Sequence, residues 1–183
     1  MIWNFPTSVE IDGISHNIRN QCDYRVVLDV IAALNDQELE MEYRVQCALI
    51  IFYEDVASIC NIDAAIQEMF RIINYGELEQ IEQEAPQMMD WEKDFKTIAP
   101  PVSRVLGYDI RNPDKYTHWW SFLGGYMEIG ECLFATVVSI RHKLRNGKKL
   151  EKWEQDFLKE NRNMVVLPIK YSKEEKELLA LFE

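Results

Sequence analysis

The residues best suited to chemistry are His118 and the two carboxylates that follow it, Glu128 and Glu131. Together they could form an acid–base pair or bind a metal ion. Carboxylate di-metal bundles, however, take a Glu-x-x-His from each of two helices, and this spacing does not occur in the sequence. A GxSxG turn, a P-loop and a GxGxxG loop are absent as well. We therefore expect no catalytic residue, no metal site and no cofactor, and a protein that is not an enzyme.

Two adjacent tryptophans, Trp119 and Trp120, are the most conspicuous binding residues in a helical pattern. Neighbours on a helix point about 100° apart, so the two indoles cannot share one face. Either both fill the core, or one is a partner-binding anchor, a role in which tryptophan is enriched. Both residues are therefore candidates for partner binding.

A basic cluster surrounds the predicted turn at Gly147. Its members are Arg141, Lys143, Arg145, Lys148, Lys149 and Lys152. Cations near a helix C-terminus complement the helix dipole, so the cluster is either a solvated helix end or a contact for an anionic partner. We take Arg141, Lys148 and Lys149 as candidate partner-binding residues, and the acidic half of another copy is one possible partner.

The charge of the chain is uneven. The net charge is −11, and residues 1–100 hold 19 acidic against 6 basic residues, whereas residues 101–183 hold 12 against 14. The acidic half would repel nucleic acid, so we expect no nucleic-acid partner. We expect no membrane partner either, because no apolar run approaches the roughly 18 residues of a spanning helix. The charge asymmetry allows a homo-oligomer.

The start of the chain has no basic flank and no apolar run, so we expect no signal peptide. Four cysteines without CxxC spacing indicate reduced thiols and a cytoplasmic protein.

The elements that position these residues predict an all-α helical bundle with a small N-terminal β-hairpin. The hairpin, residues 8–18, turns at Asp12-Gly13, a pair that favours the positive φ values of a type I′ turn. A helix follows that Asp23 can cap, then a helix over about 38–53, which is apolar all round at its end and so predicted to be central and buried. Asn61 or Asp63 caps a third helix that ends at Gly76.

The second part of the chain begins after an acidic stretch, residues 77–90, which we expect to be a mobile segment or exposed loop. A helix starting at Trp91 is predicted to kink or end at Pro100-Pro101, and the next to start at Asn112-Pro113. Two more follow, one whose apolar stripe is Leu133, Val137, Ile140 and Leu144, and one over about 148–160, before an extended stretch, residues 164–171. We predict one helical domain over residues 1–168.

The C-terminal segment, residues 169–183, is predicted to be a separate docking helix. Ser172 and Glu175 make a capping box ahead of an apolar side formed by Leu178, Leu181 and Phe182. A helix this short is marginal alone, so these three residues are candidates for partner binding.

Several motifs resemble those of the bacteriophage gene-product-fifteen family. They are Thr117-His118-Trp119-Trp120-Ser121-Phe122-Leu123, Met127-Glu128-Ile129-Gly130-Glu131, Ser139-Ile140-Arg141 and Lys148-Lys149-Leu150-Glu151-Lys152-Trp153-Glu154. The Asp12-Gly13 hairpin and Asp23-Tyr24-Arg25 are similar too, and the resemblance covers roughly residues 9–167.

The resemblance implies a tail-module protein of long-tailed phages and prophages of Gram-positive bacteria. Its implied role is that of a tail assembly chaperone in the host bacterial cytoplasm, with the tape-measure protein and the tail-tube protein as partners. The alternative is a structural virion component, a connector or tail-completion protein, that stays in the particle. The family brings no catalytic residue to this sequence.

Overall fold

The computed structural model describes residues 4–77 and 88–168, which form two compact units. The described residues of unit 1 are 4–77 and 116–123, and those of unit 2 are 88–115 and 124–168. Both units are helical, and the N-terminus forms a two-stranded antiparallel hairpin, which confirms the predicted fold class. That residues 1–168 form a single domain stays a prediction.

Unit 1 opens with the hairpin of β1 (Ser8–Ile11) and β2 (Ile14–Asn17). Ser8 pairs with Asn17 and Ile11 with Ile14, so the turn consists of Asp12 and Gly13 alone. Their φ values of 51° and 79° are those that a type I′ turn requires, which confirms the prediction. A two-stranded sheet is marginal by itself, and β1 buries alternate side chains while it packs against α3 (Ile62–Ile73).

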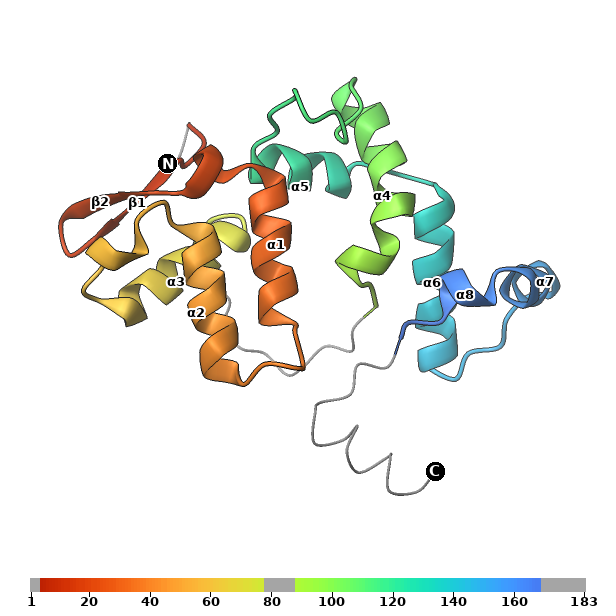
Figure 1. Cartoon of the computed structure of the whole chain (residues 1–183). Coiled ribbons are helices and arrows are strands. Elements are labelled where there is room, and N and C mark those ends of the chain that lie inside the picture. Colours follow the sequence, from red (N-terminus) through yellow and green to blue (C-terminus); the bar gives the residue numbers. More distant parts are fainter. Residues whose placement is uncertain (1–3, 78–87, 169–183) are drawn as a thin grey trace. The chain divides into compact units, whose positions relative to one another are not determined.

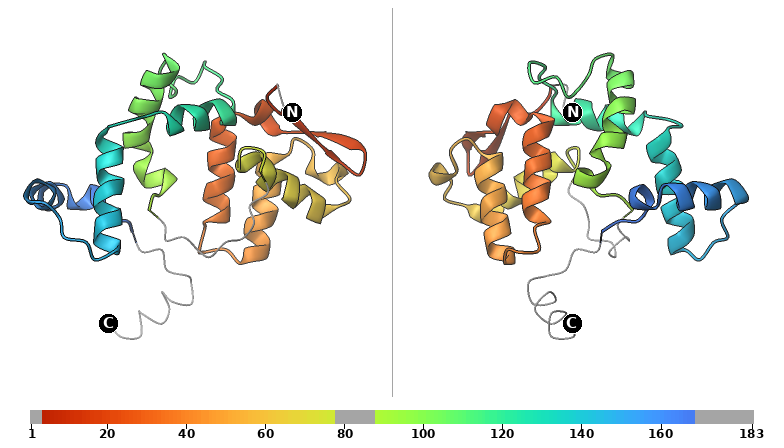
Figure 2. Two further views of the ribbon diagram at one scale, coloured as in Figure 1. Left: turned by 180° about the vertical axis from the view of Figure 1, so that it is seen from behind. Right: turned by 45° about the vertical axis from the view of Figure 1, so that its right-hand side comes forward.

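Helices α1 (Tyr24–Leu34) and α2 (Met41–Phe52) lie side by side in unit 1, as Figures 1 and 2 show. The Asp23 carboxylate accepts a hydrogen bond from the Arg25 amide at 3.0 Å, which confirms the predicted cap of α1. A short 3₁₀ helix, η1 (Arg19–Cys22), precedes it and presents the Arg19 guanidinium to carbonyls at the end of α2. The basic side chain thereby satisfies backbone acceptors that the helix leaves unpaired.

The prediction that α2 is a central buried helix is wrong. Met41, Tyr43 and Ile50 are 66%, 53% and 55% exposed, while Ala48, Leu49 and Phe52 are buried. An apolar run thus faces the core on one side only. After the 3₁₀ turn η2 (Val56–Ser58), α3 is capped by Asn61 rather than Asp63.

Unit 2 begins with α4 (Trp91–Leu106), which runs through Pro100 and Pro101. The prolines therefore do not end the helix, contrary to one of the predicted outcomes. Each removes one backbone donor, but Ile98 and Val102 on either side are fully buried, and their burial favours the helical path. The helix ends at Gly107, whose φ of 80° is left-handed, as is common after a helix C-terminus.

Helix α5 (Trp119–Met127) starts six residues later than predicted. Asn112 begins a turn instead, in which the Lys115 amide donates a hydrogen bond to the Asn112 carbonyl at 3.1 Å. The chain then has no regular secondary structure up to His118. The His118 ring nitrogen Nδ1 accepts from the Trp120 amide at 3.0 Å and caps the helix instead. The division between the two units falls inside α5, after Leu123.

The remaining elements of unit 2 are α6 (Leu133–Arg145), α7 (Lys152–Glu160) and α8 (Arg162–Val165). The predicted stripe of α6 is only half right, because Leu133 and Leu144 are 46% and 44% exposed while Val137 and Ile140 are buried. The capping box of α7 is formed by Glu151 and Glu154. Helix α8 stands where part of an extended stretch was predicted.

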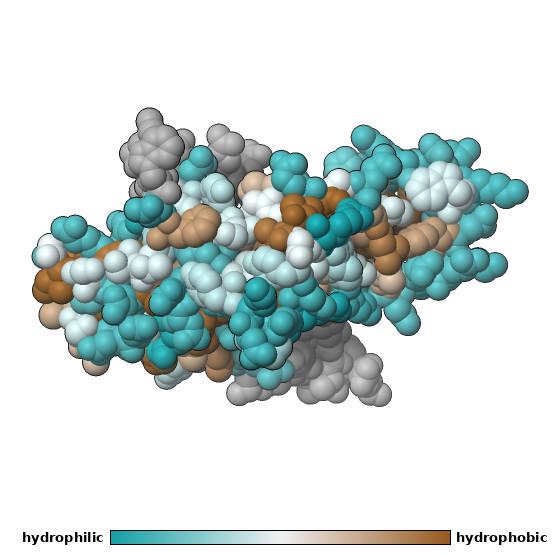
Figure 3. Space-filling model, turned by 90° about the horizontal axis from the view of Figure 1, so that it is seen from above, coloured by the Kyte–Doolittle hydropathy of each residue, from teal (hydrophilic) through white to brown (hydrophobic). Residues whose placement is uncertain are grey.

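The predicted mobile segment over 77–90 lies outside the described residues except at its ends, and so does the C-terminal docking helix with Leu178, Leu181 and Phe182. No helix of the described part is long and apolar enough to cross a membrane. On the face drawn in Figure 3, hydrophilic residues predominate and apolar residues form separate patches.

Candidate functional site

The two tryptophans are interior residues of unit 1. Trp119 is 1% exposed and Trp120 7%, so burial favours the alternative in which both fill the core over the one in which an exposed indole anchors a partner. Their indole N–H groups donate to the carbonyls of Ile73 and Ile72 at 2.9 and 2.8 Å. These carbonyls belong to the last turn of α3, which has no intrahelical donors for them. The pair therefore caps a helix while it fills the core.

Close packing around Trp120 explains why residue 76 is a glycine. Gly76 has a φ of +94°, and a Cβ placed there would lie 3.2 Å from the Trp120 ring. The chain turns beneath the indole at this point, and Tyr75 lies with its ring 5.1 Å from that of Trp120. A side chain at position 76 would meet both backbone strain and a steric clash.

His118 uses both of its ring nitrogens within unit 1. Nδ1 accepts from Trp120, and Nε2 donates to the Pro6 carbonyl at 3.0 Å, a pattern that fits the neutral Nε2–H tautomer. The ring also stacks on Phe5, with the centroids 4.5 Å apart. Burial lowers the pKa of His118, which keeps the ring neutral. The histidine thus positions the tryptophan helix and the N-terminal segment, and neither nitrogen faces a site for a metal or a substrate.

Asp23 links this cluster to α1. One carboxylate oxygen caps α1, and the other accepts from the Thr117 amide at 3.1 Å, while the Tyr24 amide donates to the Thr117 carbonyl at 2.9 Å. A single buried carboxylate therefore holds two segments that are 94 residues apart in sequence.

Arg141 is not part of the exposed basic surface, and that prediction is corrected here. It is 6% exposed in unit 2 and forms a bidentate ion pair with Asp94 at 2.6 and 2.9 Å. Its remaining donors go to the carbonyls of Met88, Met164 and Val165 at 2.7–3.1 Å. All five guanidinium N–H groups are thereby occupied, so no donor remains for a partner.

Lys148 and Lys149 are exposed, as predicted for a contact surface, on the connection between α6 and α7. We name residues 144–153 the basic turn. It is held by hydrogen bonds from the Gly147 amide to the Leu144 carbonyl and from the Lys148 amide to the Lys143 carbonyl, at 3.2 and 2.8 Å. Beside it, the Lys143 ammonium binds Glu154 at 2.7 Å, and this contact lowers the pKa of the Glu154 carboxyl. The lysines are therefore presented from an ordered loop.

An apolar hollow of about 510 Å³ opens on unit 2 between the end of α5, the α5–α6 connection and one face of α6. We name it the apolar hollow. Its lining comprises Met88, Tyr126, Met127, Ile129, Phe134, Ala135, Val138, Ser139 and His142. Met127 is 65% exposed at its edge. Methionine adapts its shape to different apolar partners, so this surface suits a helix or loop with large apolar side chains.

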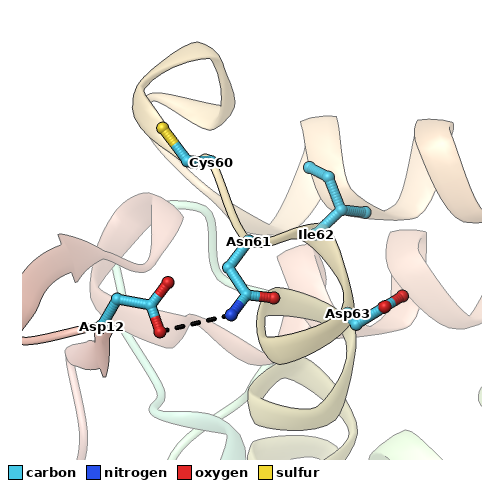
Figure 4. Close-up of a pocket in the computed structure, with 5 residues that line it drawn as sticks. All are labelled: Asp12, Cys60, Asn61, Ile62 and Asp63. Carbon is cyan, nitrogen blue, oxygen red and sulfur yellow. Dashed lines mark hydrogen bonds between the residues drawn. The ribbon is translucent and has the colours of Figure 1, made fainter.

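A second, polar pocket lies at the hairpin turn of unit 1 (Figure 4). Asp12 accepts a hydrogen bond from the Asn61 side chain at 3.2 Å, and Asn61 also caps α3. Cys60, Ile62 and Asp63 complete the lining. The hydrogen bond ties the hairpin turn to the start of α3, which gives this pocket a structural explanation.

Within the described residues, no group of three or more histidine, cysteine, aspartate or glutamate side chains is arranged to hold a metal ion. In the same part of the chain, every buried side-chain nitrogen and oxygen has a hydrogen-bond partner. The interior polar groups described above are thus engaged in holding the fold.

One family model matches the sequence over residues 1–167, and its description is Bacteriophage Gp15 protein. The chain belongs to this family. Membership of the Gp15 family places it among phage structural and morphogenesis proteins. Neither the curated proteins nor the solved structures contain a significant match.

For this Gp15 family member, the apolar hollow is the surface that sequence reasoning missed. Its residues come from three separate segments, and only the α6 residues Phe134, Ala135, Val138, Ser139 and His142 follow a helical spacing. Met127, a large apolar residue at the end of α5, was the one local signal.

Proposed function

We propose that this Gp15 family protein is a non-enzymatic tail assembly chaperone. In this role it binds the tape-measure protein in the host bacterial cytoplasm and releases it when tail-tube protein assembles around it. Family membership supports the phage morphogenesis role, and the apolar hollow on unit 2 supports the binding of an apolar client.

The hollow carries the proposal because its chemistry fits a helical client. Among its lining residues, Ile129 and Phe134 are buried and Met127 is exposed. An amphipathic helix buries its apolar face in such a groove and leaves its polar face in water. By the family resemblance the client is the long tape-measure protein, and each amphipathic helix in it would offer such a face.

The experiment co-expresses the chain with the tape-measure protein of the same phage and measures the soluble fraction of the client. We expect the chain to raise that fraction and Met127→Lys to abolish the gain, because a docked client would bury the introduced ammonium without a partner. Leu133→Lys is the matched control, since Leu133 is also an exposed apolar residue near the start of α6 but does not line the hollow.

Mass spectrometry of mature particles then separates the chaperone from a connector or tail-completion protein. A chaperone is absent from the particle, whereas a structural component is present in stoichiometric amount. Stoichiometric retention together with no gain in client solubility would replace the proposal by the structural role.

A further inference from the structure

The two units differ strongly in charge. The described residues of unit 1 include 13 acidic and 4 basic residues, whereas those of unit 2 include 11 acidic and 13 basic residues. Exposed charges separated by more than about 10 Å are screened in 0.1 M salt, so only local clusters of these charges can determine a contact. Each unit contains one such cluster on a connection between helices.

In unit 1 the cluster lies between α1 and α2, and we name residues 36–43 the acidic loop. Its four carboxylates are exposed and belong to Asp36, Glu38, Glu40 and Glu42. Met41 and Tyr43 are exposed in the adjoining first turn of α2. The guanidinium of the neighbouring Arg44 donates to the Leu39 carbonyl and the Gln37 side chain, and the Asp36 carboxylate accepts a hydrogen bond from the Glu38 amide at 2.9 Å.

In unit 2 the basic turn has the matching composition. Its four exposed cations belong to Arg145, Lys148, Lys149 and Lys152. Leu144 and Trp153 are 44% and 53% exposed beside them. Each surface thus carries four exposed charges of one sign and two large apolar side chains, and the sign differs between the two surfaces. The basic turn also contains the exposed Glu151, whose carboxylate accepts a hydrogen bond from the Trp153 indole at 2.8 Å.

We propose that the basic turn is the docking surface for a second copy of this chain, whose acidic loop supplies the opposite charge. Nucleic acid is a poor alternative because the chain as a whole carries −11. A second copy brings one acidic loop for every basic turn. Apolar contacts of Trp153 and Leu144 with Met41 and Tyr43 supply affinity that the charge pairs alone lack.

The contact joins two different surfaces, so it is heterologous and generates a ring or a filament when it repeats. Each exposed charge pair contributes a factor of about 1.4 to 5 to the association constant. Four such pairs together make association roughly four- to sixhundredfold weaker when high salt screens them. The inference concerns self-association and does not depend on the identity of the client.

The test is sedimentation velocity of the full chain over a range of concentrations at low and high salt. We expect concentration-dependent association at low salt that high salt suppresses. Glu38→Gln with Glu40→Gln, and separately Lys148→Gln with Lys149→Gln, should each weaken association about two- to 25-fold. An equimolar mixture of the two variants should form a two-chain species, because one intact acidic loop then meets one intact basic turn.

Lys96→Gln with Lys159→Gln is the matched control, since it removes the same charge from exposed positions of unit 2 outside the basic turn. Circular dichroism of every variant confirms that it is folded. A chain that stays monomeric at every concentration and salt level overturns the inference. So does a mixture of the two variants that fails to associate, or a control pair that weakens association as much as the Lys148 and Lys149 pair.

Discussion

In both units a buried side chain donates hydrogen bonds to backbone carbonyls, but the chemistry of the donor differs. In unit 1 the indoles of Trp119 and Trp120 donate to carbonyls at the end of α3, and in unit 2 the Arg141 guanidinium donates to carbonyls next to α4 and α8. The indoles are neutral and contribute mainly apolar burial. The guanidinium is a buried charge and therefore requires Asp94 as a counterion. All three side chains are buried and engaged within their own unit, although each was a candidate for partner binding in the sequence.

Trp119→Ala should have the largest effect. Loss of a buried tryptophan costs about 3–5 kcal/mol, and the Ile73 carbonyl loses its donor as well. Thermal unfolding measures the loss, and hydrogen exchange should show faster exchange in α1 and α3. Trp119→Phe should reduce the free energy of unfolding by less than half as much as Trp119→Ala does. Equal stability of the Ala variant and the natural chain would show that the indole is not a core residue.

Arg141→Met should cost about 3–5 kcal/mol, because it leaves the Asp94 carboxylate buried without its counterion. Faster hydrogen exchange is expected in α4 and α6. Adding Asp94→Leu should recover at least about 1 kcal/mol, since contacting residues couple in a double-mutant cycle. If the stability losses of Arg141→Met and Asp94→Leu were strictly additive, the ion pair would not explain the effect of Arg141→Met.

The pH dependence of stability should come in part from His118. Its pKa is lowered in the fold, so the unfolded chain binds more protons below about pH 6.5, and stability falls as the pH drops through 6.5 towards the folded pKa. His118→Asn retains an acceptor for the Trp120 amide and should flatten this slope in unfolding curves between about pH 7 and 5. The exposed His142 provides the control substitution, His142→Asn. If His118→Asn leaves the slope of stability against pH unchanged, protonation of His118 does not contribute to it.

The reactivity of the thiols should differ between the buried Cys22 and the exposed Cys60. Burial raises the pKa of Cys22 to about 12, whereas Cys60 is exposed. In the folded chain at about pH 8, where an ordinary thiol is partly ionised, alkylation should modify Cys60 and spare Cys22. Cys60→Ser should remove the fast product in peptide mass spectrometry. Rapid modification of Cys22 would mean that the region around Trp119 opens readily.

The sequence predicted local features well and long-range ones poorly. The Asp12-Gly13 turn and the Asp23 cap depend on neighbouring residues, and both are present in the structure. The burial of Arg141 depends on Asp94, which lies 47 residues away, so no local pattern could reveal it. The start of α5 was misplaced because Asn112 and His118 can both begin a helix, and only the fold selects His118.

The hydrogen bonds of Arg141 also have a topological consequence. One guanidinium fastens the backbone at Met88 and at Met164, and so closes a loop of about 75 residues by a noncovalent staple. Sequence inserted before residue 88 or after residue 168 leaves the length of this closed loop unchanged. Divergent members of a lineage could therefore lengthen either flank without raising the chain-entropy cost of folding what lies inside the staple.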